Sequence, residues 1–90
     1  MAEQYFRHLD GGVYRFVAYA RSADNDDEVV VYEHLWPFDQ GLWVRNRADF
    51  QSRFAIIDEF TVRLEMKRDR TQAQAAVTAA KAARRAAKQV

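Results

Sequence analysis

Two histidines and one nearby carboxylate are the residues of this chain that could support acid–base chemistry or hold a metal ion. His8 has Asp10 two residues later, and His34 lies in a separate segment. A histidine oriented by a carboxylate can transfer protons near neutral pH. A metal site needs three or four converging ligands, and these three side chains would converge only if the fold brought them together. The simpler expectation is that the His8 ring packs on aromatic side chains, with no metal and no cofactor.

The chain lacks the residues that nucleophilic catalysis and phosphate binding by a glycine-rich loop usually require. The chain has no cysteine, and Ser22 and Ser52 stand in polar contexts without the glycine-flanked turn that exposes a catalytic serine. Asp10-Gly11-Gly12 is a turn sequence and lacks the Lys-Ser/Thr pair that follows the glycines of a phosphate-binding loop. We therefore expect no catalytic residues, and a function in binding.

The best binding candidates combine aromatic area with arginine, a pairing typical of interaction hot spots. Both tryptophans lie within residues 29–50. Trp36 and Phe38 flank a proline in a turn and are predicted to be exposed. The planar fork of Arg45 suits a carboxylate or another anion, although an ion pair with Glu33 or Asp49 is an equal alternative. The candidate binding residues on the domain are Trp36, Phe38, Arg45, Arg7 and Trp43.

The last twenty residues differ in kind from the rest. Residues 71–90 contain nine alanines and no glycine, proline or aromatic residue, which predicts a helix. A helical spacing places small residues on one stripe: Ala73, Ala76, Ala80, Ala83, Ala87 and Val90. It places the basic residues on the opposite side: Lys81, Arg84, Arg85 and Lys88. Two alternatives stay open, a frayed or disordered tail and a helix docked through the stripe, which could also mediate self-association.

Charge is distributed unevenly along the chain. Residues 1–70 carry 10 Lys/Arg and 13 Asp/Glu, whereas residues 71–90 carry four basic residues and no acid. A basic tail on a mildly acidic body indicates an anionic partner, and Arg84 and Arg85 are the tail's candidate contacts. An acidic body argues against nucleic acid as the main ligand. A protein partner is therefore expected, with nucleic acid as the alternative.

Ninety residues make one domain. The lack of cysteine favours a reducing compartment, the cytoplasm. No segment has the length of apolar sequence that a membrane span or a signal peptide needs, so no membrane association is expected.

Several segments read as strands. Residues 13–21 alternate, and residues 28–36 are rich in valine and end before Pro37. An acidic hairpin loop, residues 22–27, separates them. Residues 42–45 form a short strand after the Gly41 turn. Residues 56–66 alternate again, which predicts a strand with an inward face made of Phe60, Val62, Leu64 and Met66.

A short helix is expected between the last two of these strands. Asn46 can cap it, and Asp49 lies near its positive end. Phe50 and Phe54 would lie one turn apart on this helix, near residues 49–54. We count four strands, with room for a fifth near the N-terminus. The expected fold is mainly β (α+β), a small SH3-like or half-open β-barrel over residues 4–66. Residues 67–90 form an alanine-rich basic helix or tail.

The same residues resemble a family of small bacterial and phage proteins, domain of unknown function 1653, over about residues 5–54. The resemblance rests on the segments Tyr5-Phe6-Arg7-His8 with Gly11 or Gly12, Tyr14 with Ala20-Arg21, Val30-Val31-Tyr32 with Leu35, Gly41-Leu42-Trp43-Val44-Arg45, and Phe50. The chain departs from the family where Asn46 replaces the usual proline and Trp36 the usual tyrosine. The resemblance implies a compact β-rich domain and no known activity. On this basis we expect a non-enzymatic protein-binding module, such as an accessory protein that acts on a larger bacterial or phage machine.

Overall fold

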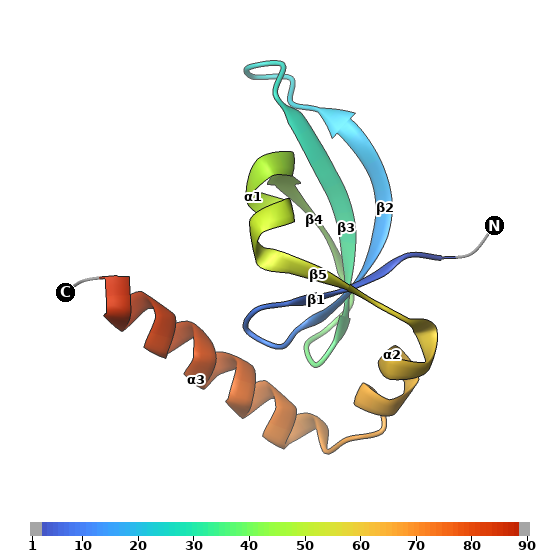
Figure 1. The fold of residues 1–90 in the computed structure, drawn as a ribbon, viewed down its shortest axis with the longest axis vertical. Helices are drawn as coiled ribbons and strands as arrows, with labels where there is room; N and C mark the ends of the chain where they lie inside the picture. Colours follow the sequence, from blue (N-terminus) through green and yellow to red (C-terminus); the bar gives the residue numbers. More distant parts are fainter. Residues whose placement is uncertain (1–2, 89–90) are drawn as a thin grey trace.

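The computed structural model describes residues 3–88 and shows an α+β fold, a five-stranded antiparallel sheet with three helices (Figure 1). The strands are β1 (Tyr5–His8), β2 (Val13–Arg21), β3 (Glu28–Trp36), β4 (Gly41–Asn46) and β5 (Phe54–Ile57). The helices are α1 (Arg47–Arg53), α2 (Glu59–Glu65) and α3 (Arg70–Lys88). The strand order is β4-β3-β2-β1-β5, so the sheet is open, with β4 and β5 at its edges. The mainly β (α+β) class is confirmed, but the predicted SH3-like or half-open barrel is not formed, because β4 pairs only with β3 and β5 only with β1 within the described chain.

The central hairpin follows the sequence pattern closely. β2 and β3 have the predicted bounds, and the acidic loop between them is confirmed. Strict alternation fails in one place, because a register shift between Phe16 and Ala18 marks a β-bulge. After the bulge Tyr19 pairs with Val30 and its ring meets that of Phe16, with centroids 5.1 Å apart. Tyr19 therefore lies on the same face as Phe16, not on the opposite face.

The core lies on the sheet face that α1 covers. Paired residues on neighbouring strands point to one face, and the buried side chains of that face surround Phe50 of α1. The core consists of Phe6, Val30, Tyr32 and Phe50, with Tyr14, Phe16 and Phe54 packed against it. Seven of the chain's side chains thus form one mainly aromatic cluster, and its edge-to-face contacts add to area burial.

Helix α1 begins as predicted and ends earlier than predicted. The Asn46 side chain accepts a hydrogen bond from the Ala48 amide at 3.0 Å and caps the helix. Phe54 was expected on this helix, yet it is the first residue of β5. Its ring still stacks on that of Phe50, with centroids 4.1 Å apart and planes 9° apart. Phe50 and Phe54 are therefore in contact as predicted, although Phe50 lies on a helix and Phe54 on a strand.

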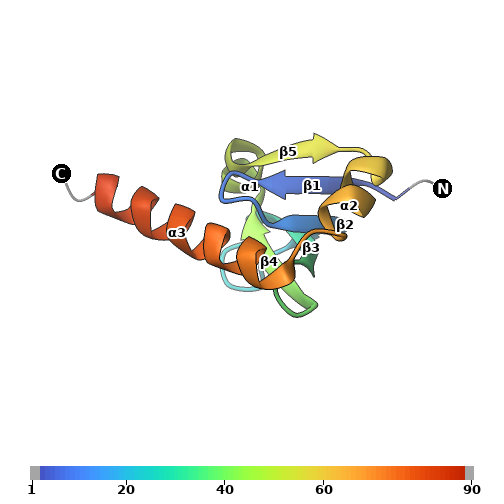
Figure 2. The same ribbon diagram turned by 90° about the horizontal axis from the view of Figure 1, so that it is seen from below.

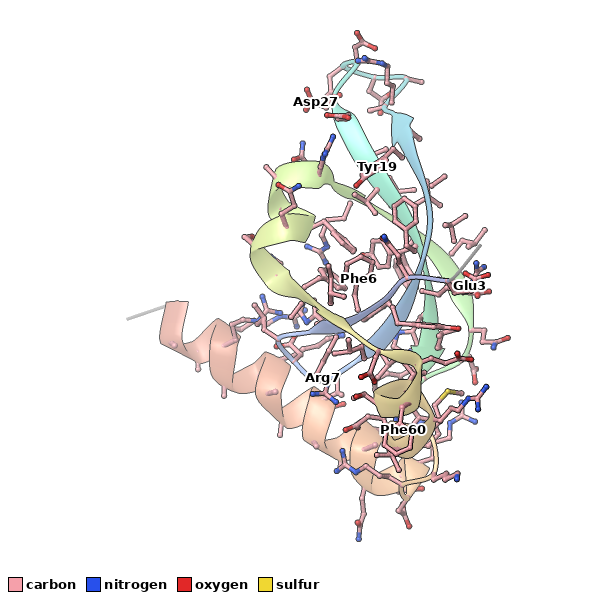
Figure 3. All side chains as sticks on the ribbon, turned by 45° about the vertical axis from the view of Figure 1, so that its right-hand side comes forward. Glu3, Phe6, Arg7, Tyr19, Asp27 and Phe60 are labelled. Carbon is pink, nitrogen blue, oxygen red and sulfur yellow. The ribbon has the colours of Figure 1, made fainter. Side chains whose placement is uncertain are left out.

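The segment after β5 is a helix where a strand was predicted. The Asp58 carboxylate accepts a hydrogen bond from the Thr61 amide at 2.7 Å, which caps α2. Of the predicted inward face only Val62 is buried, whereas Phe60 is 69% exposed, and Leu64 and Met66 are exposed as well. Figure 3 shows Phe60 on α2 at the periphery of the molecule.

Helix α3 docks across the end of the sheet that carries the β1–β2 and β3–β4 turns (Figures 1 and 2). Arg70 and Gln74 both donate to the Pro37 carbonyl oxygen at 2.9 Å. Ala73 and Val77 are buried. Gly11, at φ +104°, gives the β1–β2 turn a backbone conformation that residues with a side chain rarely adopt, and this turn lies beside Val77 of α3.

The docked face of α3 differs from the predicted stripe. Ala73 belongs to both, but Ala76, Ala83 and Ala87 are exposed. Arg84 faces the sheet and bonds Asp10, so the prediction that the basic residues all lie on the outward side is wrong. The stripe residue Val90 lies outside the described residues. None of the described helices is long and apolar enough to cross a membrane.

Candidate functional site

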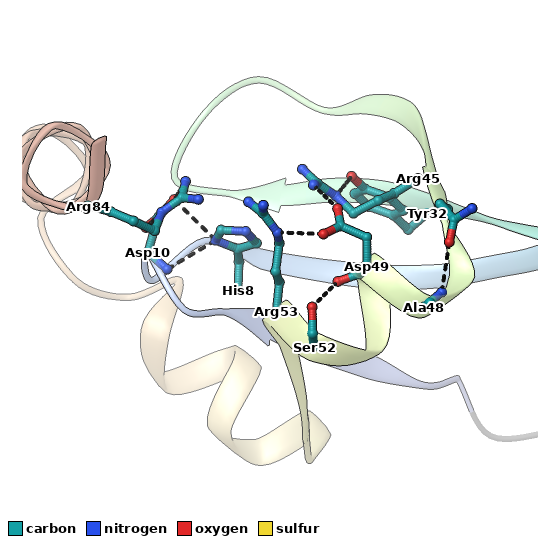
Figure 4. A network of polar contacts seen from close by, with 10 residues as sticks. His8, Asp10, Tyr32, Arg45, Ala48, Asp49, Ser52, Arg53 and Arg84 are labelled. Atoms are coloured by element: carbon teal, nitrogen blue, oxygen red, sulfur yellow. Dashed lines mark hydrogen bonds and ion pairs between the residues drawn. The ribbon is translucent and has the colours of Figure 1, made fainter. Parts of the chain in front are cut away.

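A polar cavity of about 310 Å³ lies where α3 approaches the sheet (Figure 4). Residues of β1, the β1–β2 turn, β2, β4, α1 and α3 line this cavity. The lining residues are His8, Asp10, Tyr14, Arg45, Arg53, Lys81, Arg84 and Arg85. Five of the eight are basic and one is acidic, so we refer to this site as the cationic cavity.

On the sheet side, one carboxylate holds two arginines in place. Asp49 accepts from Arg45 at 2.6 Å and from Arg53 Nε at 2.9 Å. Arg45 Nε also donates to the Tyr32 hydroxyl at 3.3 Å. The two guanidinium groups lower the pKa of Asp49 below its ordinary value. The ion pair of Arg45 with Asp49, one of the two alternatives that the sequence left open, is confirmed.

On the helix side, Arg84 reaches a buried carboxylate. It donates to both Asp10 oxygens, Nε to Oδ1 at 3.2 Å and Nη2 to Oδ2 at 2.8 Å. The Asp10 side chain is only 2% exposed. The Asp10 amide also donates to His8 Nδ1 at 3.0 Å. This contact ties the β1–β2 turn, the imidazole and α3 together.

His8 stays neutral in this environment. Burial lowers its pKa first, the nearby Asp10 carboxylate acts in the opposite direction, and the positive charges of Arg45, Arg84 and Arg53 lower the pKa further. Nδ1 lies 3.3 Å from an Asp10 oxygen as well as accepting the Asp10 amide. With the ring neutral, the amide contact assigns the proton to Nε2.

His8, Asp10 and His34, the three side chains considered for a metal site, do not line one cavity. His8 and Asp10 line the cationic cavity and His34 does not. The Tyr14 ring lies beside both imidazoles, with centroids 6.4 Å from His8 and 4.7 Å from His34. His34 Nε2 accepts the Phe38 amide at 3.0 Å. Burial, with a smaller effect from Lys81, lowers the pKa of His34 to about 4. Within residues 3–88 no group of three His, Asp or Glu side chains is placed to hold a metal ion.

The aromatic residues proposed for binding fall in different surroundings. Trp36 and Phe38 are half-buried, so the prediction that they are the exposed pair is wrong. The Trp36 indole N–H is buried and has no hydrogen-bond partner among the described residues, and Lys81 Nζ lies 5.9 Å from the Phe38 ring centroid. Trp43, on the edge strand β4, is 58% exposed.

The predicted arginines also separate into different environments. Arg7 pairs with Glu65 of α2 at 2.9 Å and does not line the cavity. Arg45, Arg84 and Arg85 meet in the cationic cavity, from β4 and α3. Arg53 was not among the predicted site residues, although its spacing of four residues from Asp49 was a usable signal for an ion pair on a helix.

Two apolar features are formed by residues that do not line the cationic cavity. One is the edge strand β4, where Leu42 and Val44 are 66% and 62% exposed on either side of Trp43. The other is a cavity of about 340 Å³ beside α1. Its lining includes Phe6, Phe16, Tyr19, Phe50, Phe54 and Ile56.

Comparison with known families agrees with the resemblance identified from the sequence motifs. The profile described as "Protein of unknown function (DUF1653)" matches residues 4–66. The chain belongs to the DUF1653 family. The match covers the whole sheet and α2, and α3 follows it. No curated protein and no solved structure matches the chain significantly. Membership of DUF1653 assigns no activity, so the function has to be argued from this chain's own surfaces.

Proposed function

We propose that this DUF1653 protein is a non-enzymatic binding module that recognises another protein through its edge strand β4. The observation that carries the proposal is the exposure of three consecutive large apolar side chains, Leu42, Trp43 and Val44. Single exposed apolar residues are common on protein surfaces, whereas a contiguous group on an edge strand marks an interaction surface or an aggregation hazard.

Strand addition is the mode of recognition that this geometry favours. β4 is six residues long and pairs only with β3 in the described chain, which leaves the outer side of its backbone available to an extended partner segment. Val44 pairs with Val31 and Leu42 with Glu33, so these two side chains lie on one face of the sheet. Trp43, paired with Tyr32, lies on the other. A strand added to β4 would therefore meet apolar side chains on both faces, including a tryptophan, a residue common at hot spots.

Such a module suits a small accessory protein, of bacterial or phage origin, that acts in the cytoplasm by binding a larger assembly. The lack of cysteine fits a reducing compartment. The charge distribution disfavours nucleic acid as the ligand of the domain surface. Every arginine of the described chain outside the cationic cavity lies within 4.0 Å of a carboxylate, as an ion pair with Glu or Asp. No continuous track of free positive charge is left on the described surface for a phosphate backbone.

The test replaces the apolar edge with lysines, which block strand pairing in natural edge strands. The tagged full-length Leu42→Lys/Val44→Lys variant and the wild-type protein are used to capture partners from the native cell. Ile56→Lys is the matched control, since Ile56 is 76% exposed on the opposite edge strand β5. We expect the β4 variant to lose a partner that wild type and Ile56→Lys retain. A purified partner should shift the fluorescence of Trp43, recorded in a Trp36→Phe background.

Other outcomes separate the alternatives. If a folded β4 variant retains every partner, β4 is not the recognition surface. If light scattering shows a wild-type dimer that the variant converts to a monomer, the partner strand comes from a second copy of this chain. Binding of an oligonucleotide that weakens steeply as salt rises would favour the nucleic-acid alternative.

A further inference from the structure

We propose that the cationic cavity binds the dianionic phosphate group of a small phosphomonoester. The site shares β4 with the proposed recognition edge through Arg45, but Leu42, Trp43 and Val44 do not line it, and it does not depend on the function proposed for them. Positive charge converges on the cavity from β4, α1 and α3. The cavity is lined by five basic side chains and one carboxylate, Asp10. A second carboxylate, Asp49, binds two of the arginines and does not line the cavity. A surplus of three positive charges remains, whereas the arginines elsewhere in the described chain are balanced by carboxylates.

The arginines keep hydrogen-bond donors that their partners do not use. A guanidinium carries five N–H donors. The contacts within residues 3–88 engage Nε and Nη1 of Arg45, Nε of Arg53, and Nε and Nη2 of Arg84. Nη2 of Arg45, both Nη atoms of Arg53 and Nη1 of Arg84 remain for another acceptor. A phosphate group offers several acceptor oxygens and binds such forks by charge-assisted hydrogen bonds.

The arginines are held rigidly, as a binding site requires. Asp49 anchors Arg45 and Arg53, and the buried Asp10 anchors Arg84. Their side chains are 31%, 24% and 26% exposed, so each is partly shielded from water. Charges in such a place interact more strongly than charges on an open surface. After burial, the same three arginines lower the pKa of His8, because their positive charges all lie near its ring.

The size and the walls of the cavity define the ligand class. A volume of about 310 Å³ lies at the lower end of the range for small-molecule sites and exceeds what a phosphate group alone would fill. Tyr14 and His8 supply ring surface for the organic part of a phosphomonoester. Burial raises the pKa of Tyr14 to about 12, so its hydroxyl stays protonated and can donate to an anion. The charge is local, which favours one compact dianion over a nucleic-acid backbone.

Such a ligand would also hold α3 on the sheet. Lys81, Arg84 and Arg85 come from α3, whereas Arg45 and Arg53 belong to the sheet side. An anion between the two groups removes their mutual repulsion and bridges them. Binding should therefore slow amide exchange along α3.

The experiment is calorimetric titration of the full-length protein, in a buffer without phosphate, with inorganic phosphate, phenyl phosphate and dimethyl phosphate. We expect phenyl phosphate to bind at least as tightly as inorganic phosphate, and dimethyl phosphate, a monoanion, to bind more weakly than either. The Lys81→Gln/Arg85→Gln variant removes two cavity charges that make no ion pair within residues 3–88, so it should fold normally. It should weaken phenyl phosphate binding by about tenfold. Arg63→Gln/Lys67→Gln removes two exposed charges outside the cavity and should change binding by less than about twofold.

Three binding results would overturn the proposal. The first is no saturable binding of inorganic phosphate or phenyl phosphate by the wild-type protein. The second is an equal loss of affinity in both double variants, which would mean diffuse attraction and no site. The third is tight binding of an oligonucleotide without terminal phosphate by a protein that does not bind phenyl phosphate. Protection of α3 amides on adding phenyl phosphate supports the site, and protection confined to other elements contradicts it.

Discussion

Replacing Arg84 with glutamine should release α3 from the sheet. The contact joins residues 74 positions apart, and it is the link between the far half of α3 and the β1–β2 turn. Arg84 donates two hydrogen bonds to the Asp10 carboxylate, which is 2% exposed. Arg84→Gln removes the positive charge and leaves the buried carboxylate without an ion-pair partner. An unpaired buried charge strongly destabilises a folded protein.

The magnitude follows from the burial of the two partners. Removing one member of a fully buried pair costs roughly 3–5 kcal/mol. Arg84 itself is 26% exposed, so water partly screens the pair and the expected cost is about 2 kcal/mol. Only two other α3 side chains, Ala73 and Val77, are buried in the described part of the helix. The cost should therefore appear as local opening of α3 with the sheet intact, because an isolated helix of this length is marginal in water.

Native-state hydrogen exchange measures this opening directly. A loss of about 2 kcal/mol corresponds to a roughly 30-fold faster exchange of the amides near Val77. Arg85→Gln is the control, since it removes the same charge one residue later from an exposed side chain. In Asp10→Asn/Arg84→Gln no charge is left buried, and about half of the protection should return. Equal protection in Arg84→Gln and Arg85→Gln, within about twofold, would refute the reasoning.

Three further perturbations test other parts of the structure. The folded-state pKa of His34 is lowered from 6.5 to about 4 by burial and then by Lys81, so the folded protein binds fewer protons than the unfolded chain between these values. The free energy of unfolding should therefore fall by about 3 kcal/mol as the pH drops through this window, and urea unfolding of His34→Gln should show a smaller fall. Phe50→Ala should cost about 3–5 kcal/mol in urea unfolding because Phe50 is 5% exposed. Phe60→Ala, at 69% exposure, should cost less than about 0.5 kcal/mol, and equal losses would contradict the helix assignment of residues 59–65. Asp58→Ala removes the α2 cap and should cost about 1 kcal/mol, measured by thermal unfolding at neutral pH.

The central hairpin could be predicted because its sequence signals are local. Valine-rich alternation bounded by an acidic loop and a proline is sufficient to place β2 and β3. No local sequence feature indicated the bulge beside Phe16. The bulge places Tyr19 on the same face of the sheet as Phe16, which strict alternation did not predict. Closure of the sheet depends on whether the edge strands meet, which the pattern of any one strand does not determine.

The sequence of residues 56–66 is compatible with both a strand and a helix. Apolar residues at every second position predicted a strand. In a helix, Val62 and Glu65 would lie on one side. The cap at Asp58 and the ion pair between Glu59 and Arg63 favour the helix. The Asp58 cap is a pattern present in the sequence, but the prediction followed the apolar alternation alone.

The cationic cavity was beyond prediction because it joins segments distant in the sequence. Arg45 and Arg84 were both identified as candidates, but for separate surfaces. Their convergence requires α3 to cross the end of the sheet, and that direction is set by contacts of Arg70 and Gln74 with the Pro37 carbonyl. A helical projection of residues 71–90 alone put Arg84 on the solvent side, because it contains no information about which face the domain would cover.

The cationic cavity is built from both parts of the chain, the domain and the alanine-rich helix that follows it. The segment that matches DUF1653 ends at residue 66, and it supplies His8, Asp10, Tyr14, Arg45 and Arg53 to the cavity, while α3 supplies the other three lining residues. In the folded chain the Asp10 carboxylate is 2% exposed, and within the described residues it has no lysine or arginine partner within 4.0 Å other than Arg84. A buried carboxylate without a partner is costly. The alanine-rich helix therefore completes a site that the domain begins, since it provides three of the five basic lining residues, and one of these, Arg84, is the partner of Asp10.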